Sequence, residues 1–141
     1  CSGRTTRSSC AGYGCGRRVV PIVDVEPVCA PDEPRAAVST RGLADAVGQA
    51  IGSPPGHTWV RLRDLPVDAY AENGVDLDPT LRPVFVRVLH ARSPTGAARA
   101  EEAGRLTVAV AACLGLPPER MHVEYAPDGA GRMAFGGRIL D

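Results

Sequence analysis

Apolar and polar positions along the chain form two kinds of pattern, and each kind occurs twice. Runs of β-branched residues from Ile22 to Val28 and from Val84 to Leu89 have the length and composition of β-strands. The stretches from Ala36 to Ile51 and from Ala97 to Leu114 instead place apolar residues four positions apart, which is typical of amphipathic helices. The pattern therefore predicts a strand followed by a helix in each half of the chain.

A second strand is predicted after each helix. Residues 59–63 alternate between the two faces of a strand, with Val60 and Leu62 on one face and Trp59, Arg61 and Arg63 on the other. Residues 121–125 show the same alternation. Each half of the chain is therefore predicted to form a β-α-β unit.

The two halves are related by an internal repeat with an offset of 63 positions. The repeated positions include apolar residues of both helices, the glycine that ends each helix, and a Pro-Pro pair that follows it. They are Leu43, Val47, Ile51, Gly52, Pro54, Pro55 and Val60, which recur as Leu106, Val110, Leu114, Gly115, Pro117, Pro118 and Val123. We interpret the chain as a duplication, with repeat one at residues 21–82 and repeat two at residues 83–141.

Two β-α-β units with right-handed crossovers place both helices on the same face of one four-stranded sheet. The predicted fold class is therefore α+β, in two layers. The other face of the sheet needs cover, and Trp59 lies on it. We expect other subunits to supply that cover.

Composition excludes several function classes. The net charge is zero, so there is no electrostatic case for binding nucleic acid or an anionic membrane. No stretch approaches the ~20 apolar residues of a membrane span. The five cysteines are odd in number and lack metal-ligand spacing, as do His57, His90 and His122, so we expect no metal site. We expect unpaired thiols, a reducing compartment and a cytoplasmic location.

The amino-terminal segment is unlike the rest. Residues 1–18 are rich in Gly, Ser, Arg and Cys without apolar periodicity, and the chain begins with Cys1. We expect residues 1–20 to be a disordered or spurious extension. A start at Val20, with removal of that residue, would expose Pro21 as a free secondary amine at the head of the first strand.

Several motifs together resemble the tautomerase superfamily, which includes 4-oxalocrotonate tautomerase, 5-carboxymethyl-2-hydroxymuconate isomerase and macrophage migration inhibitory factor. They are the proline-first strand Pro21 to Val25, the duplicated unit, the segment Pro117 to Tyr125 and the glycine-rich segment Met133 to Gly137. The resemblance covers residues 21 to about 138. It implies a cofactor-free homotrimer that acts on a small carboxylate substrate, with Pro21 as the catalytic base.

The resemblance also implies substrate-binding arginines. Arg92, in the sequence Ala91-Arg92-Ser93, matches a catalytic arginine of single-repeat tautomerases, and Arg61 or Arg63 lies in the region that supplies another. Tyr70 and Asn73 fall where the glycine-rich loop of repeat one would run, and either contact substrate or make a turn.

The expected reaction is enol–keto tautomerisation of a small unsaturated 2-oxo or 2-hydroxy acid. Two alternatives stay open. A protonated Pro21 would act as an acid in hydration, dehalogenation or decarboxylation of an unsaturated acid, and the same fold also suits a non-enzymatic binding module.

Overall fold

The computed structural model describes residues 21–33 and 38–141. Its main elements are β1 (Ile22–Cys29), α1 (Thr40–Ile51), β2 (Trp59–Leu62), β4 (Val84–Leu89), α2 (Gly96–Leu114) and β5 (Met121–Tyr125). Three short strands complete it, namely β3 (Leu65–Pro66), β6 (Ala134–Phe135) and β7 (Arg138–Ile139), together with 3-10 turns at Val67–Ala69, Pro79–Leu81 and Pro118–Arg120.

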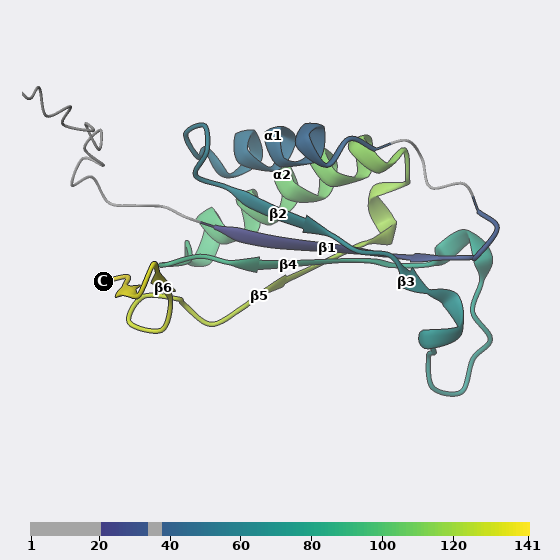
Figure 1. Cartoon of the computed structure of the whole chain (residues 1–141). Coiled ribbons are helices and arrows are strands. Elements are labelled where there is room, and N and C mark those ends of the chain that lie inside the picture. Colours follow the sequence, from purple (N-terminus) through teal and green to yellow (C-terminus); the bar gives the residue numbers. More distant parts are fainter. Residues whose placement is uncertain (1–20, 34–37) are drawn as a thin grey trace, which may run out of the picture.

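The predicted two-layer α+β architecture is confirmed (Figure 1). The sheet has the order β2-β1-β4-β5, and β3 pairs with the end of β1. Strands β1 and β2 are parallel, as are β4 and β5, whereas the central pair β1 and β4 is antiparallel. Both helices lie on one face of the sheet, so the chain consists of two β-α-β units that meet along β1 and β4.

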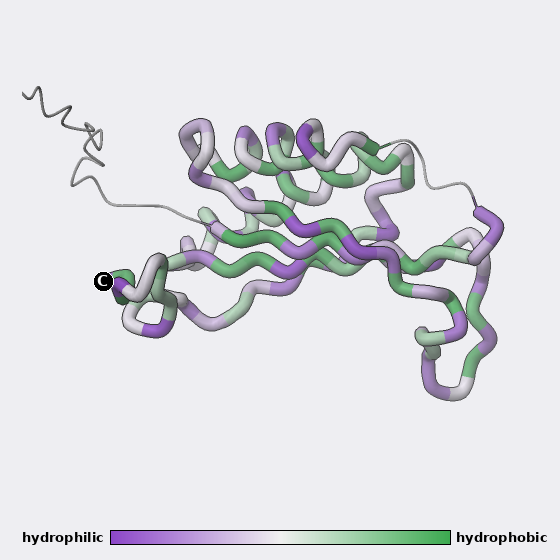
Figure 2. The backbone as a smooth tube through the Cα atoms, viewed as in Figure 1, coloured by the Kyte–Doolittle hydropathy of each residue, from purple (hydrophilic) through white to green (hydrophobic). Residues whose placement is uncertain are grey.

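The core lies between the sheet and the two helices. Alternate side chains of β1 and β4 are buried against apolar residues of both helices. Figure 2 shows hydrophobic and hydrophilic residues interspersed along these strands and helices. The repeated positions Leu43, Val47, Leu106 and Val110 are fully buried. These residues, which recur in the sequence, therefore occupy equivalent places in the core of the two β-α-β units.

Helix α1 is shorter than predicted. It begins at Thr40 rather than Ala36, because the Ser39 side chain accepts a hydrogen bond from the Gly42 amide at 3.1 Å and caps the first turn. The predicted residues 36 and 37 lie outside the described part of the chain. Gly52 and Gly115 end the two helices, as predicted, and the structure shows both in the left-handed conformation.

The repeat also extends to two tight turns. Gly136 and Gly137 connect β6 and β7, while Asn73 and Gly74 connect the single bridge between Glu72 and Val75. Because β1 and β4 run antiparallel, the two turns lie at opposite ends of the sheet, with β6 near the start of β1 (Figure 1).

The predicted extension at residues 1–20 lies outside the described residues. Among those that are described, no helix is long and apolar enough to cross a bilayer.

Candidate active site

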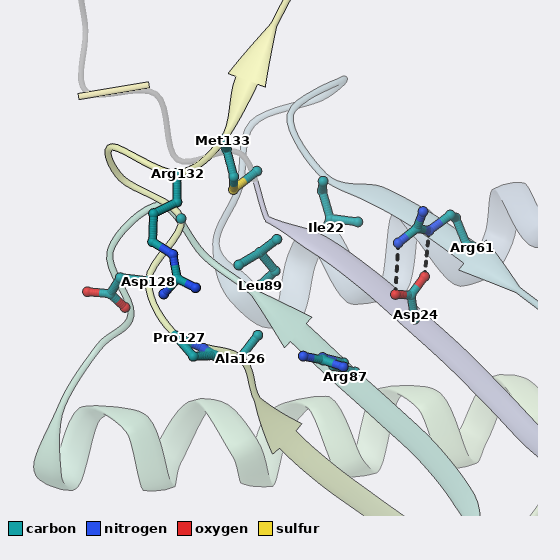
Figure 3. Close-up of a pocket in the computed structure, with 11 residues that line it drawn as sticks. Ile22, Asp24, Arg61, Arg87, Leu89, Ala126, Pro127, Asp128, Arg132 and Met133 are labelled. Carbon is teal, nitrogen blue, oxygen red and sulfur yellow. Dashed lines mark hydrogen bonds and ion pairs between the residues drawn. The ribbon is translucent and has the colours of Figure 1, made fainter. Parts of the chain in front are cut away.

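A pocket of about 350 Å³ opens at the start of β1, on the sheet face away from the helices (Figure 3). We call this helix-free face the open face; it carries Asp24, Trp59, Arg61, Arg87, His122 and Glu124. The pocket is lined by Ile22, Asp24, Arg61, Arg87, Leu89, Ala126, Pro127, Asp128, Gly129, Arg132 and Met133. Three guanidinium groups around an apolar floor suit a small organic anion.

Strand alternation and register bring the sheet residues together. Val23 and Val88 point toward the helices, so Ile22, Asp24, Arg87 and Leu89 point to the open face. Asp24 is the register partner of Arg61 on one side and of Arg87 on the other. Two arginines therefore flank one carboxylate across three adjacent strands.

Asp24 forms an ion pair with only one of its two neighbouring arginines. Arg61 Nε and Nη2 bond the two Asp24 carboxylate oxygens at 2.6 and 2.9 Å, which is a bidentate pair (Figure 3). The structure gives neither Arg87 nor Arg132 a salt bridge within residues 21–33 and 38–141. Arg87 and Arg132 are therefore the pocket cations left to neutralise a bound anion.

The opposite wall is the loop of residues 126–133. It is attached to the segment after β4, because Gly129 N–H donates to His90 O at 2.8 Å and Ala130 N–H donates to Ala91 O at 2.9 Å. Ser93 N–H also donates to Asp128 Oδ1 at 2.9 Å. That hydrogen bond, with the charges of Arg99 and Arg92, holds the pKa of Asp128 below its ordinary value.

Pro21 lies directly before β1, beside the pocket but not among its lining residues. Its ring is fully buried, and its carbonyl accepts a hydrogen bond from the Trp59 amide at 3.0 Å. The next residue, Ile22, lines the pocket. In the full chain the nitrogen of Pro21 is an amide and has no basic lone pair.

Two of the three predicted arginines, Arg61 and Arg92, lie at this same end. Arg61 lines the pocket, whereas Arg63 is exposed and does not. Arg92 is exposed in the segment after β4, close enough for its charge to lower the pKa of the pocket residue Asp128.

Within one chain, Tyr70 and Asn73 lie at the end of the sheet away from the pocket. The Tyr70 ring is 5.8 Å from that of Phe85, whose register partner is Glu26, far along β1 from Pro21. The Tyr70 hydroxyl donates to Glu72 at 2.9 Å, and that hydrogen bond raises the pKa of the phenol. Asn73 forms the tight turn described above. One chain does not bring these two residues to the pocket, because the repeats are antiparallel.

Sequence reasoning missed Asp24, Arg87, Asp128 and Arg132. A signal for Arg87 was present, because alternation along β4 places it on the same face as Arg61. Asp128 and Arg132 lie in an irregular loop whose path no periodicity specifies. Among the described residues, no group of three or more His, Cys, Asp and Glu side chains could hold a metal ion.

The chain matches no protein-family model and no curated protein sequence. Solved structures do resemble it. A fused 4-OT in an asymmetric trimer is 22% identical at a TM-score of 0.66, over 84% of this chain and 94% of that one. A protein inactivated by 2-oxo-3-pentynoate is 21% identical at a TM-score of 0.64, over 84% and 94%.

A third similar structure is a member of the cis-3-chloroacrylic acid dehalogenase family. It is 20% identical at a TM-score of 0.63, over 85% of this chain and 83% of that one. These similarities confirm the predicted resemblance to the tautomerase superfamily at the level of the fold.

Proposed function

We propose that the protein is a tautomerase or isomerase of small unsaturated 2-oxo or 2-hydroxy carboxylic acids, with Pro21 as its general base. The observation that carries this proposal is the arginine-lined pocket directly beside Pro21 in a tautomerase fold. The similar protein inactivated by 2-oxo-3-pentynoate supports the substrate class, since that inactivator is itself an unsaturated 2-oxo acid.

The proposed chemistry is a proton transfer within the substrate. A free amino-terminal amine has an ordinary pKa of about 7.7 to 8.0, and burial lowers it by disfavouring the ammonium form. Such an amine suits general-base work near neutral pH. It would take a proton from the carbon beside the carbonyl, leaving a dienolate, and return the proton to a different carbon or oxygen.

Arg87 and Arg132 would bind the substrate carboxylate and the developing oxyanion, because neither is neutralised by a salt bridge in the described part of the chain. Arg61 is already paired with Asp24, so it would bind substrate only through its remaining N–H donors and with its charge balanced. Arg92 would act from the neighbouring segment. A cofactor-free reaction, a cytoplasmic location and the two repeat boundaries stay predictions from the sequence.

The test compares two forms of the protein, one beginning at Pro21 and one carrying residues 1–20. The longer form holds the proline nitrogen as an amide, so it should lose the base contribution of roughly 10²- to 10⁴-fold. Turnover of 2-hydroxymuconate-type and phenylenolpyruvate substrates is measured alongside circular dichroism of both forms. Equal activity, with the extension intact by mass, would show that Pro21 is not the base.

A second candidate uses the same residue as an acid. Asp24 and Asp128 both line the pocket, and carboxylates near an amine favour its protonated form. The enzyme would then hydrate, dehalogenate or decarboxylate an unsaturated acid, and the similarity to the cis-3-chloroacrylic acid dehalogenase family supports this alternative. NMR titration of the Pro21 nitrogen distinguishes the two roles, since a pKa well above about 8 favours the acid.

We also propose that the chain forms a homotrimer through its open face. Trp59 is 46% exposed there, and one similar structure is a trimer. Assembly would give Tyr70 and Asn73 a route to the pocket of a neighbouring chain, which they lack within their own. Light scattering at micromolar concentration tests this proposal, and a stable monomer would contradict it.

A further inference from the structure

A buried polar cluster joins α2 to the ends of β4 and β5, behind the pocket. His90 and Glu102 are 2% and 5% exposed, and His90 Nε2 lies 2.7 Å from Glu102 Oε1. The Tyr125 hydroxyl donates to the same oxygen at 2.9 Å, and the Tyr125 and His90 rings stack at 6.1 Å. Burying polar groups is costly unless each has a hydrogen-bond partner, and here the three side chains supply partners to one another.

Glu102 accepts hydrogen bonds as a carboxylate. Burial alone would raise its pKa, but the hydrogen bond and charge of His90, the Tyr125 hydrogen bond and the charge of Arg105 together hold the pKa below its ordinary value. An ionised carboxylate has no proton to donate, so His90 Nε2 carries the proton of the shared bond.

His90 is placed where it can control the pocket. It directly follows Leu89, whose side chain lines the pocket and whose register partner is Ile22. That pair ends the ladder, so His90 directly follows β4 and Pro21 directly precedes β1 at the same end of the sheet. The His90 carbonyl accepts a hydrogen bond from the N–H of Gly129, which is a pocket residue.

The contact at Gly129 is close. A Cβ at this position would lie 2.0 Å from Met133 Sδ and 3.2 Å from His90 O. The 126–133 loop therefore fits directly on the backbone of His90, and a displacement of that backbone would move the loop.

We infer that His90 and Glu102 are positioning residues, which fix the 90–93 segment to α2 and thereby set where Arg92 and the 126–133 loop stand relative to Pro21. The inference rests on the proposed function for the role of Arg92, but the structural coupling stands on its own hydrogen bonds. Neither residue touches the pocket, so their effect passes through the segment and the loop.

The first experiment measures amide hydrogen exchange by NMR in the full chain. Glu102→Gln removes the charge of the buried acceptor with little change of shape, and Glu101→Gln is the matched control at an exposed neighbour. We expect Glu102→Gln to speed exchange of the Gly129 and Ala130 amides about tenfold or more, while Val25 and Val86 stay protected. Unchanged exchange at Gly129 and Ala130 would overturn the inference.

A pair of substitutions at His90 separates positioning from packing. His90→Gln keeps a donor nitrogen near the place of Nε2, whereas His90→Phe keeps a ring to stack on Tyr125 but cannot donate. We expect His90→Gln to retain the slow exchange and His90→Phe to lose it. Equal loss in both variants would show that the ring's packing, and not its bond to Glu102, holds the loop.

The second experiment is kinetic and uses the form of the protein that turns over a 2-oxo acid. Small misplacements of a substrate-binding group are costly, so Glu102→Gln should raise KM roughly 10- to 100-fold with a smaller change in kcat. In an Arg92→Ala background the same substitution should change KM much less, because the group being positioned is gone. Fully additive effects would overturn the link to Arg92. If no form turns over any acid, the proposed function fails, and the exchange results still decide the positioning role.

Discussion

At the scale of single residues, pairing decides which arginines can bind a substrate. Asp24 takes both of its hydrogen bonds from Arg61, and the Arg61 side chain is 62% exposed. The pair uses two of the five N–H donors of Arg61, so a substrate carboxylate could still reach it, but the positive charge it would meet is already balanced by Asp24. Arg87, the other register partner of Asp24, keeps its charge available. The family resemblance points to Arg61 or Arg63, but only the structure shows that Arg61 lines the pocket and is already paired.

Replacing Arg87 should therefore weaken substrate binding. We expect Arg87→Gln to raise KM roughly 10- to 100-fold, because a hydrogen bond to a charged group contributes about 1.5 to 3 kcal/mol. Arg63→Gln is the matched control, since Arg63 is exposed and does not line the pocket. Steady-state kinetics on the active form compares the two variants. If Arg63→Gln raised KM more than Arg87→Gln, Arg87 would not be the arginine that binds the substrate carboxylate.

At the scale of elements, the two helices end alike but begin differently. Ser39 caps α1 with its side chain, whereas Thr95 precedes α2 without such a hydrogen bond. We expect Ser39→Ala to lower the free energy of unfolding by about 1 kcal/mol, as loss of a capping hydrogen bond does. Thr95→Ala should change it much less. Urea unfolding of both variants measures the difference, and equal losses would show that the Ser39 bond does not stabilise α1.

The elements also show what the sequence could predict. Strands β4 and β5 have the predicted bounds, because alternation over five or six residues strongly constrains a strand. The predicted start of α1 at Ala36 was wrong, because the apolar periodicity extends to the N-terminal side of Ser39, which caps the helix. For Tyr70 and Asn73 the repeat identified a real turn, but sequence order alone did not show that antiparallel repeats place it at the far end of the sheet.

At the scale of the whole molecule, the buried carboxylate makes stability depend on pH. The pKa of Glu102 is lowered in the folded chain from an ordinary value of 4.5, so its contribution is present above 4.5 and lost as pH falls through the lower folded value. Replacing Glu102 by Gln removes this dependence. The thermal midpoint should therefore fall less between pH 7 and pH 3 in Glu102→Gln than in the parent protein, as measured by circular dichroism. An identical fall in both proteins would mean that Glu102 is not the titrating group.

The assembly of subunits is also a property of the whole molecule. A charge introduced into the interface should prevent assembly, whereas a charge introduced on the other face should not. Trp59 stands on the open face, 46% exposed, with its ring edge-on to Phe135 at 4.9 Å. Trp59→Asp would bury an unpaired carboxylate in any interface formed there, which is strongly unfavourable. We expect this variant to stay folded but to lose the trimer in light scattering.

Val108→Asp makes a comparable change on the helix layer, where Val108 is 63% exposed. If the open face is the interface, the helix layer faces solvent, and this variant should keep the trimer. The reverse result, a trimer that survives Trp59→Asp and dissociates with Val108→Asp, would place the interface on the helices. Because the proposed route of Tyr70 and Asn73 to a neighbouring pocket depends on the open face, that result would also remove both residues from the candidate site.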